Sequence, residues 1–346
     1  MRRAVIKRTG AAAAVLIAAL FLLLFISCSD QENAVCEGSI ELHFIDVGEA
    51  DACLIITDGH AMLVDGGNSD DSSLVYAYLK EHSVTHLDYV FCTHPHEDHV
   101  GGLAGAVNYA SVGRVFCPEA NEGLKAYNAF VRQLEKQGAA IESLQAGETL
   151  PLGKAEIKVL APDHITGDLN NDSYVLMITF GSKRFLLTGD MEAEEERALL
   201  GSGADLDCDV LKVAHHGSGG STSAEFLEKA SPEYAVISVG VYNDHGHPSD
   251  KCLSRLVEAG AKVIRTDVSG HIVISSDGRL LTVSTNRGGT LAEDGPTYIL
   301  NKWSKVFHRP DCESVRKMSQ RNRIEFYGTR EEAIEQGYKP CGSCKP

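Results

Sequence analysis

Short apolar segments separated by turn residues run along most of this 346-residue chain. Segments rich in β-branched and aromatic residues predict strands over 40–47, 52–56, 60–65, 87–92, 112–117, 155–160, 174–180, 184–188, 209–214, 234–239, 262–266, 271–276 and 280–284. Apolar positions at helical spacing predict helices over 72–82, 122–137, 191–200, 222–230 and 250–259. Because strands and helices mix throughout, the pattern predicts an α/β layered domain.

The N-terminal residues predict an export signal. Four basic residues precede an apolar run from Ala11 to Ile26, as in secretory signal peptides. The run is shorter than the roughly 20 residues of a membrane-spanning helix, and Phe25-Ile26-Ser27-Cys28 resembles a bacterial lipobox. This resemblance implies removal of residues 1–27 as a signal peptide and lipid attachment to Cys28; the alternative is an uncleaved signal anchor. With either, we expect anchoring at the outer face of the bacterial cytoplasmic membrane, followed by a linker at 28–39.

The distribution of charge indicates two regions. Residues 1–27 hold four basic and no acidic residues, so the rest has 28 Lys and Arg against 48 Asp and Glu, a net charge of −20. Residues 298–346 hold ten basic and six acidic residues, a net of +4, which leaves −24 for residues 28–297. The net charge of −20 after residue 27 argues against a nonspecific nucleic-acid-coating protein. A polar, glycine-containing linker at 286–297 then divides a domain at 40–285 from a small C-terminal module.

Four metal-capable side chains follow the strand predicted at 87–92: His94, His96, Asp98 and His99. In an extended segment His94 and His96 project to one side, whereas Asp98 and His99 follow a turn toward a second position. This arrangement suits two ions that each keep an open site for water. A histidine-rich surface loop would not explain the aspartate at this spacing. The sequence therefore predicts two divalent ions, zinc or manganese.

The run His94-Pro95-His96-Glu97-Asp98-His99 resembles the HxHxDH signature of the metallo-β-lactamase superfamily. Further motifs in the superfamily's order extend the resemblance over about residues 40–285. The resemblance implies an αββα sandwich in which the two leading histidines hold one ion and the Asp-His pair holds the other.

Downstream residues complete the site that this resemblance implies. Asp190 would bridge the two ions, because a carboxylate presents two oxygens and offsets the repulsion between them. His215 would complete the second ion's ligands, with His216 as the alternative. Asp65 is expected to orient a ligand instead of binding metal.

One position departs from the superfamily's pattern. A third histidine for the first ion is absent, and the strand entry reads Asn170-Asn171-Asp172-Ser173. Loss of one imidazole would weaken the first site or favour a harder ion such as manganese. The carbonyl of Asn171, the carboxylate of Asp172 or water would take the empty position.

The same strand entry, together with Thr188-Gly189-Asp190, His215-His216-Gly217-Ser218 and Gly246-His247-Pro248-Ser249, resembles the soluble hydrolase domain of the ComEC DNA-uptake family. This resemblance implies nucleic-acid phosphodiester hydrolysis, with Asp98 or Asp190 holding the attacking water. His247 either contacts the phosphate or leaving group or is a loop histidine that caps the helix starting at 250. Apart from the N-terminal run the sequence has no apolar span, so we expect no transport pore in this chain.

Near the C-terminus, His308, Cys312, Cys341 and Cys344 form two pairs with zinc-ligand spacing. The flanking residues resemble the zinc-binding domain of the Ada DNA-repair protein, with His308 in place of its first cysteine. This replacement argues against methyl transfer. A structural zinc, DNA binding by the basic surface, and a Cys341–Cys344 disulfide are the alternatives, and the spacing favours zinc.

Three functions remain open from the sequence. The first is a metal-dependent nuclease or phosphodiesterase at the cell surface, and the second is a hydrolase of another ester, a lactam or a cyclic nucleotide. The third is a noncatalytic DNA-capturing lipoprotein with a degenerate site. Retention of Asp98, His99, Asp190 and His215 favours an enzyme.

Overall fold

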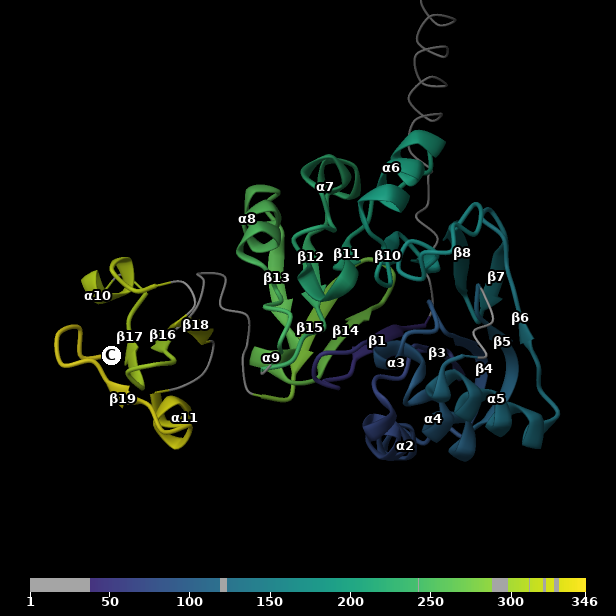
Figure 1. Cartoon of the computed structure of the whole chain (residues 1–346), viewed down its shortest axis with the longest axis horizontal. Coiled ribbons are helices and arrows are strands. Elements are labelled where there is room, and N and C mark those ends of the chain that lie inside the picture. Colours follow the sequence, from purple (N-terminus) through teal and green to yellow (C-terminus); the bar gives the residue numbers. More distant parts are fainter. Residues whose placement is uncertain are drawn as a thin grey trace, which may run out of the picture. The chain divides into compact units, whose positions relative to one another are not determined.

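The computed structural model describes residues 38–118, 123–241, 243–287, 298–310, 312–319, 322–326 and 330–346 (Figure 1). The predicted signal peptide, Cys28, nearly all of the first linker and residues 288–297 of the second lie outside the described residues. Among the helices of the described residues, none has the length and apolar character needed to cross a membrane.

Two sheets form the large domain. The first has the strand order β15-β14-β1-β2-β3-β4-β5-β6. It consists of β1 (Ile40–Phe44), β2 (Cys53–Thr57), β3 (His60–Val64), β4 (His86–Phe91), β5 (Ser111–Phe116), β6 (Ile141–Glu142), β14 (Ile272–Ser276) and β15 (Leu281–Thr285). The second has the order β13-β12-β11-β10-β9-β8-β7. It consists of β7 (Thr149–Leu152), β8 (Ala155–Ala161), β9 (Val175–Phe180), β10 (Lys183–Leu187), β11 (Val210–Lys212), β12 (Tyr234–Ile237) and β13 (Lys262–Arg265).

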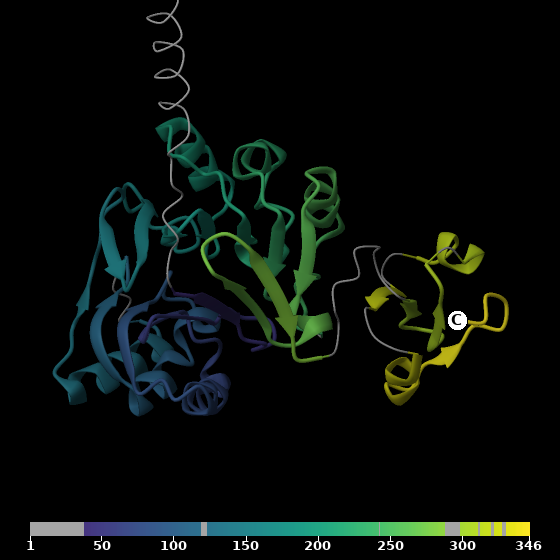
Figure 2. The same cartoon turned by 180° about the vertical axis from the view of Figure 1, so that it is seen from behind.

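Alternating side chains place one face of each sheet in a shared apolar core. On β1, Ile40, Leu42 and Phe44 pack in this core, which also contains residues of β8, β9 and β10. The outer faces are covered by helices (Figure 2). These are α2 (Ser72–Glu81), α4 (Leu103–Tyr109) and α5 (Lys125–Gln137) on the first sheet, and α6 (Ala193–Ser202), α7 (Ala224–Ala230) and α8 (Asp250–Glu258) on the second. The predicted αββα sandwich is confirmed.

In the large domain, four short helical segments were absent from the sequence prediction. They are η1 (Ser69–Asp71), α3 (Glu97–Val100), η2 (Ala214–Gly217) and α9 (Thr266–Ser269). The sequence also did not predict α4, which is short and contains Ala, Gly and Asn instead of a clear apolar stripe. This helix begins after Gly102, where an added Cβ would lie 1.8 Å from the carbonyl oxygen of Gly66. Glycine at 102 therefore allows the metal-ligating loop to pack against the turn after β3.

The C-terminal module contains a four-stranded sheet with the order β18-β16-β17-β19. Its elements are β16 (Tyr298–Asn301), β17 (Val306–His308), α10 (Glu313–Arg316), β18 (Arg323–Phe326), α11 (Arg330–Glu335) and β19 (Lys339–Pro340). Two small apolar clusters support it, and the second includes Cys312 and Cys341 beside Ile299 and Val315. Two of the predicted zinc ligands are thus part of the module's own core.

Candidate metal centre

The predicted metal ligands of the large domain lie at strand ends that meet at one edge of the sandwich. Strands β3 to β5 are parallel in the first sheet, and β10 to β13 are parallel in the second. The loop with Asp98 and His99 follows β4, Asp190 follows β10, and His216 follows β11. Both sheets therefore contribute side chains at the carboxyl ends of their strands, the usual position of sites in α/β folds.

Asp98, His99, Asp190 and His216 converge on one point. Each offers a ligand atom, and these four atoms all lie within 4.8 Å of one another. His99 Nε2 lies 3.3 Å from Asp190 Oδ1, and His216 Nε2 lies 3.4 Å from Asp98 Oδ2. Two imidazoles and two carboxylates at these distances form a ligand set for a divalent ion.

Hydrogen bonds on the far side of each imidazole fix its tautomer. His99 Nδ1 lies 2.9 Å from Asp65 Oδ2, and His216 Nδ1 lies 3.0 Å from the carbonyl oxygen of Ser238. A carboxylate and a carbonyl only accept, so both Nδ1 atoms carry a proton, and in the neutral rings both Nε2 lone pairs face the cluster. Asp65 also accepts from the backbone N–H and hydroxyl of Thr93. These contacts fit the ligand-orienting role that the sequence analysis gave to Asp65.

Three polar atoms that face the cluster are buried without a hydrogen-bond partner. They are His99 Nε2, His216 Nε2 and Asp190 Oδ1. Leaving such atoms unpaired costs roughly 1–3 kcal/mol each, and a cation bound among them would satisfy all three. The residues therefore fit a metal ion.

The charges of the site reinforce this fit. Burial alone would lower the pKa of His216, but the negative charges of Asp190 and Asp51 outweigh it and raise the pKa to about 9. The pKa of His99 is likewise raised, because Asp190 and Asp65 outweigh the effect of burial. The surroundings favour positive charge, whether a proton or a metal ion supplies it.

His94 and His96 form the adjoining half of the site. His94 Nε2 lies 2.9 Å from His96 Nδ1, so both nitrogens face one point. On the other side of its ring, His94 Nδ1 lies 3.2 Å from Ser173 Oγ. Burial and the neighbouring charge of His99 hold the pKa of His94 well below its usual value, which keeps the neutral, metal-binding form.

The side-chain oxygens of Asn171 and Asp172, two of the proposed substitutes for the missing histidine, accept hydrogen bonds from other residues. Asn171 Oδ1 accepts the backbone N–H of Glu195 in α6, 3.2 Å away. Both carboxylate oxygens of Asp172 accept hydrogen bonds from Thr166 and Gly167. Ser173 instead lies beside His94, and its Oγ also accepts the backbone N–H of Asp190.

The histidine that joins Asp98, His99 and Asp190 is His216. The sequence analysis had favoured His215 for this position, with His216 as the alternative. His215 Nε2 is 3.7 Å from Asp190 Oδ2, and its Nδ1 is 3.1 Å from Glu192 Oε1. Both histidines have left-handed backbone conformations, with φ of 49° and 52°. Left-handed backbone is uncommon for residues other than glycine, so sequence spacing could not predict the directions of these two side chains.

His247 lies next to the metal-ligating group. Its ring stacks on His216 with centroids 6.4 Å apart, and its Nδ1 lies 3.2 Å from Glu49 Oε1. Asn243 holds the backbone, accepting the N–H of His247 at 2.9 Å. The helix-capping alternative for His247 is wrong, because Ser249 caps α8 through its side-chain oxygen.

Four residues of the site were missed by the sequence analysis: Glu49, Asp51, Ser173 and Lys212. Glu49 and Asp51 lie in the turn between β1 and β2, far along the chain from the metal-ligating runs. Lys212 ends β11 and is 5% exposed. For Asp51 and Lys212, the only signal in the sequence is a charged residue within an apolar segment. That signal does not indicate a function.

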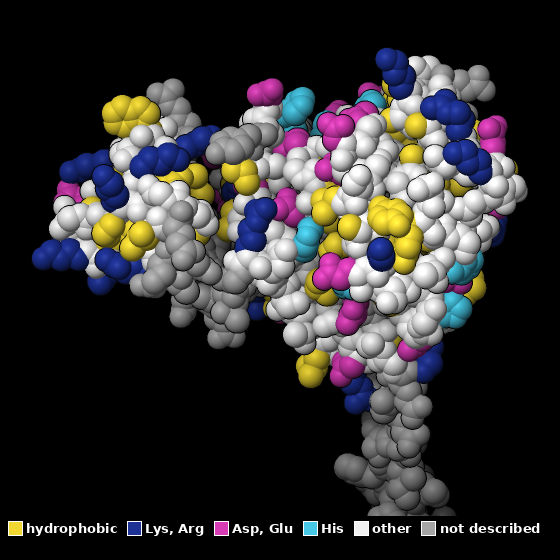
Figure 3. Space-filling model, turned by 90° about the horizontal axis from the view of Figure 1, so that it is seen from below, with side chains coloured by type: hydrophobic (Ala, Val, Ile, Leu, Met, Phe, Trp, Pro, Cys, Tyr) yellow, Lys and Arg dark blue, Asp and Glu magenta, His cyan; other side chains and the backbone are white. Residues whose placement is uncertain are grey.

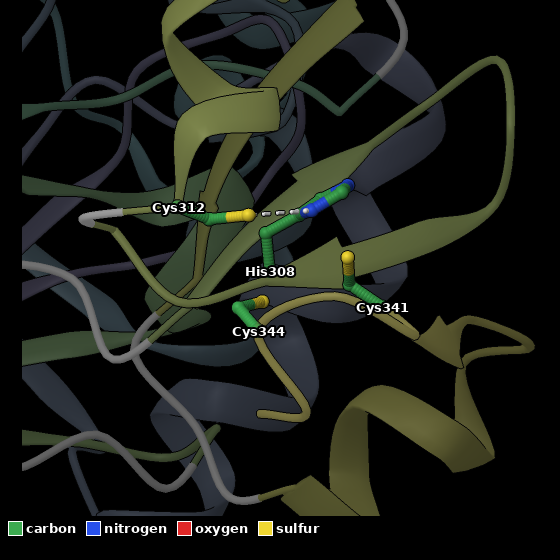
Figure 4. A group of neighbouring side chains, drawn as sticks. All are labelled: His308, Cys312, Cys341 and Cys344. Atoms are coloured by element: carbon green, nitrogen blue, oxygen red, sulfur yellow. Dashed lines mark hydrogen bonds between the residues drawn. The ribbon is translucent and has the colours of Figure 1, made fainter.

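In the C-terminal module the four predicted ligands also converge (Figure 4). The ligand atoms of His308, Cys312, Cys341 and Cys344 lie within 4.8 Å of one another, and Cys312 Sγ is 3.5 Å from His308 Nδ1. Backbone N–H groups of Arg309 and Ser343 donate to the sulfurs of Cys344 and Cys341. All described cysteines are free, so none of them forms the alternative disulfide. One imidazole and three thiols fit a closed tetrahedral zinc site.

Comparisons with known proteins agree with both sites. The family model described as the metallo-beta-lactamase superfamily matches residues 45–241, and the metal binding domain of Ada matches residues 291–346. ComE operon protein 3 of Bacillus subtilis (strain 168) is 29% identical over 284 residues, covering 77% of this chain and 36% of the relative. Competence protein ComA of Neisseria gonorrhoeae is 31% identical over 255 residues, covering 72% and 34%. The chain thus spans about a third of the length of these relatives.

Among solved structures, the metallo-beta-lactamase fold protein YhfI from Bacillus subtilis aligns with a TM-score of 0.47 and 15% identity. The alignment covers 69% of this chain and all of YhfI. The first family match contains all the converging side chains of the large domain, and the second contains the four zinc-ligand candidates. The chain therefore belongs to the metallo-beta-lactamase superfamily of metal-dependent hydrolases, is related to competence proteins, and carries an Ada-type metal-binding module.

Proposed function

We propose that this protein is a metal-dependent nuclease that hydrolyses phosphodiester bonds in nucleic acid outside the cytoplasm. The observation that carries the proposal is the pair of adjoining ligand sets at one sandwich edge, with the His247 imidazole beside them. Relatives named as competence proteins support nucleic acid as the substrate class. The lipobox-like sequence before Cys28 supports attachment to the outer face of the membrane.

Each part of the site has a role in this proposal. The two ligand sets would hold divalent ions, which would supply an activated water and stabilisation of the charge on the leaving oxygen. Asp190 is connected to both ligand sets. Its Oδ1 approaches His99, and its backbone N–H donates to Ser173, which lies beside His94. Its carboxylate, or that of Asp98, positions the attacking water.

His247 would donate a proton to the leaving oxygen. Its Nδ1 donates to Glu49, so its Nε2 is the atom available to substrate. Glu49 is held in turn by the backbone N–H of Gly240, at 2.9 Å. The Glu49 carboxylate therefore fixes one orientation of the ring.

The C-terminal module would hold the nucleic acid. Lys and Arg side chains gather on its surface (Figure 3), in line with its net charge of +4. Trp303, the only tryptophan of the chain, is 83% exposed in the turn between β16 and β17, with Lys302 and Lys305 close in sequence. Asn301 Oδ1 accepts the N–H of Trp303 and of Ser304 and fixes this turn. A rigid exposed aromatic with basic neighbours suits stacking on an unpaired base.

The test is cleavage of labelled single- and double-stranded DNA and RNA by the chain without residues 1–27, with manganese, zinc or chelator. An Asp98→Ala/His99→Ala variant should lose cleavage. A matched control is His60→Ala/Asp88→Ala, which removes another His–Asp pair, 3.0 Å apart and partly exposed, outside the metal-ligating group. Metal binding without cleavage of any nucleic acid would overturn the proposal and turn attention to lactams, other esters and cyclic nucleotides.

The role of His247 has its own test. The nitrophenolate leaving group of a nitrophenyl phosphodiester departs without protonation. The sugar oxygen that leaves during DNA cleavage needs a proton. His247→Ala should therefore slow DNA cleavage by roughly 10²-fold or more, the usual scale for a general acid, and leave nitrophenyl ester hydrolysis nearly unchanged. Equal loss on both substrates would assign His247 to substrate binding instead of proton transfer.

A further inference from the structure

A buried ion pair lies behind the metal-ligating group. Lys212 Nζ is 2.7 Å from Asp51 Oδ2 and donates to the carbonyl oxygen of Val213 at 2.8 Å. Both side chains are almost fully buried. Burying two charges is costly and often contributes no net stability. The pair therefore calls for an explanation beyond fold stability.

Asp51 connects this pair to the metal ligands. Its backbone N–H donates to the carbonyl oxygen of Asp98 at 3.0 Å. Its Oδ1 is buried without a hydrogen-bond partner, 3.8 Å from His216 Nδ1, and its Oδ2 is 4.0 Å from His99 Nδ1. The carboxylate thus faces two ligand imidazoles on the side away from the point where their Nε2 atoms converge.

Carboxylates outnumber lysine and arginine side chains near this point. Four carboxylates are linked through the two imidazoles: Asp51, Asp65, Asp98 and Asp190. Lys212 is the only lysine or arginine with a described ion pair to any of them. Among the described ion pairs, it is therefore the only one that brings a lysine or arginine to the acidic cluster.

We propose that Lys212 is a built-in counter-cation of the metal centre, which holds Asp51 in place and sets how tightly divalent ions bind. When no ion is bound, its ammonium offsets part of the repulsion among the carboxylates. When ions bind, the same charge repels them and weakens their affinity. This inference concerns metal binding and does not depend on the substrate.

The proposal has a definite thermodynamic sign. Removing the ammonium should destabilise the metal-free protein more than the metal-loaded protein, and by linkage the ions must then bind more tightly. We expect Lys212→Met to lower the metal dissociation constant at least tenfold. Asp51→Asn leaves an unpaired ammonium and should raise the constant at least tenfold. The double variant should return it close to the original value.

The experiment is a Co²⁺ titration in competition with a chromophoric chelator, combined with thermal unfolding with and without metal. The thiolates of the C-terminal module give Co²⁺ a sulfur charge-transfer band that the oxygen and nitrogen ligands of the large domain lack, so the two sites are followed separately. Lys183→Met is the matched control, because it also removes a lysine that pairs with an aspartate, Asp209, at 2.6 Å. Lys183 lies at the start of β10, whereas the metal ligands follow the ends of their strands.

Opposite shifts for Lys212→Met and Asp51→Asn, with no shift for Lys183→Met, are the expected result. Equal destabilisation of the metal-free and metal-loaded forms by Lys212→Met, with unchanged affinity, would overturn the proposal and leave a purely structural pair. If Lys212→Met does not fold, Lys212→Gln and the Asp51→Asn arm decide the same question. Unchanged affinity in Asp51→Asn would then also overturn it.

Discussion

The sandwich domain and the C-terminal module place their metal-ligating side chains differently relative to their apolar cores. In the sandwich, the ligands lie at an edge, beyond a continuous core between two sheets and two further cores under the helices. In the module, Cys312 and Cys341 belong to one of two small apolar clusters. The difference indicates that metal serves chemistry in the first region and folding in the second, because a small core needs such a cross-link.

Removing metal should separate the two regions most strongly. Structural zinc contributes roughly 10–16 kcal/mol to the folding of small zinc domains, so chelation or Cys341→Ser should unfold the module. The sandwich should stay folded under the same conditions. Limited proteolysis with mass spectrometry reports both regions in one sample. If the module resists protease in excess chelator, its folding does not depend on metal, and the two regions do not differ in this respect.

Packing should matter more than metal for the sandwich. Gly102→Ala places a Cβ against the Gly66 carbonyl, and because the neighbour is backbone we expect a loss of about 3 kcal/mol, the upper end for overpacked sites. Thermal unfolding in chelator measures this loss. Gly138→Ala is a less suitable control because of its positive φ, whereas Gly201→Ala meets no atom within 4 Å and has an ordinary φ. A Gly102→Ala protein as stable as Gly201→Ala would contradict the prediction.

Removing an orienting carboxylate should affect metal binding without unfolding the sandwich. Asp65→Asn keeps the shape of the side chain but weakens its acceptance of the His99 Nδ1 proton. We expect metal affinity to fall by about 10–100-fold, as for other ligand-orienting residues. Chelator competition measures the change, and Asp88→Asn is the control. If Asp65→Asn unfolds the domain instead of weakening metal binding, Asp65 is a structural residue.

The smallest expected effect concerns the module's surface. Trp303→Ala should weaken single-stranded oligonucleotide binding by about 1 kcal/mol, the lower end for one stacked base, with no loss of stability. Because the chain has one tryptophan, quenching of its fluorescence by oligothymidylate reports contact at this residue alone. Trp303→Phe should retain most of the affinity. Quenching by anionic vesicles but not by oligonucleotide would assign the turn to the membrane surface.

The sequence predicted those parts of the molecule in which local pattern determines the outcome. Apolar patterning located the strands of the large domain except the short β6 and β7, and close spacing located the ligands around His94 and Cys341. It favoured His215 over His216, whereas the structure places His216 in the four-residue group, because it could not foresee the left-handed backbone at both residues. It also could not pair Asp51 with Lys212, since their contact exists only after the two sheets have packed.

The four converging side chains come from two different sheets: Asp98 and His99 follow a strand of the first, and Asp190 and His216 follow strands of the second. An ion held by all four would link the two sheets at the open edge of the sandwich. Its ligands come together only when the apolar faces of the sheets have packed. We therefore expect a metal ion to bind all four side chains only after the two sheets have packed together.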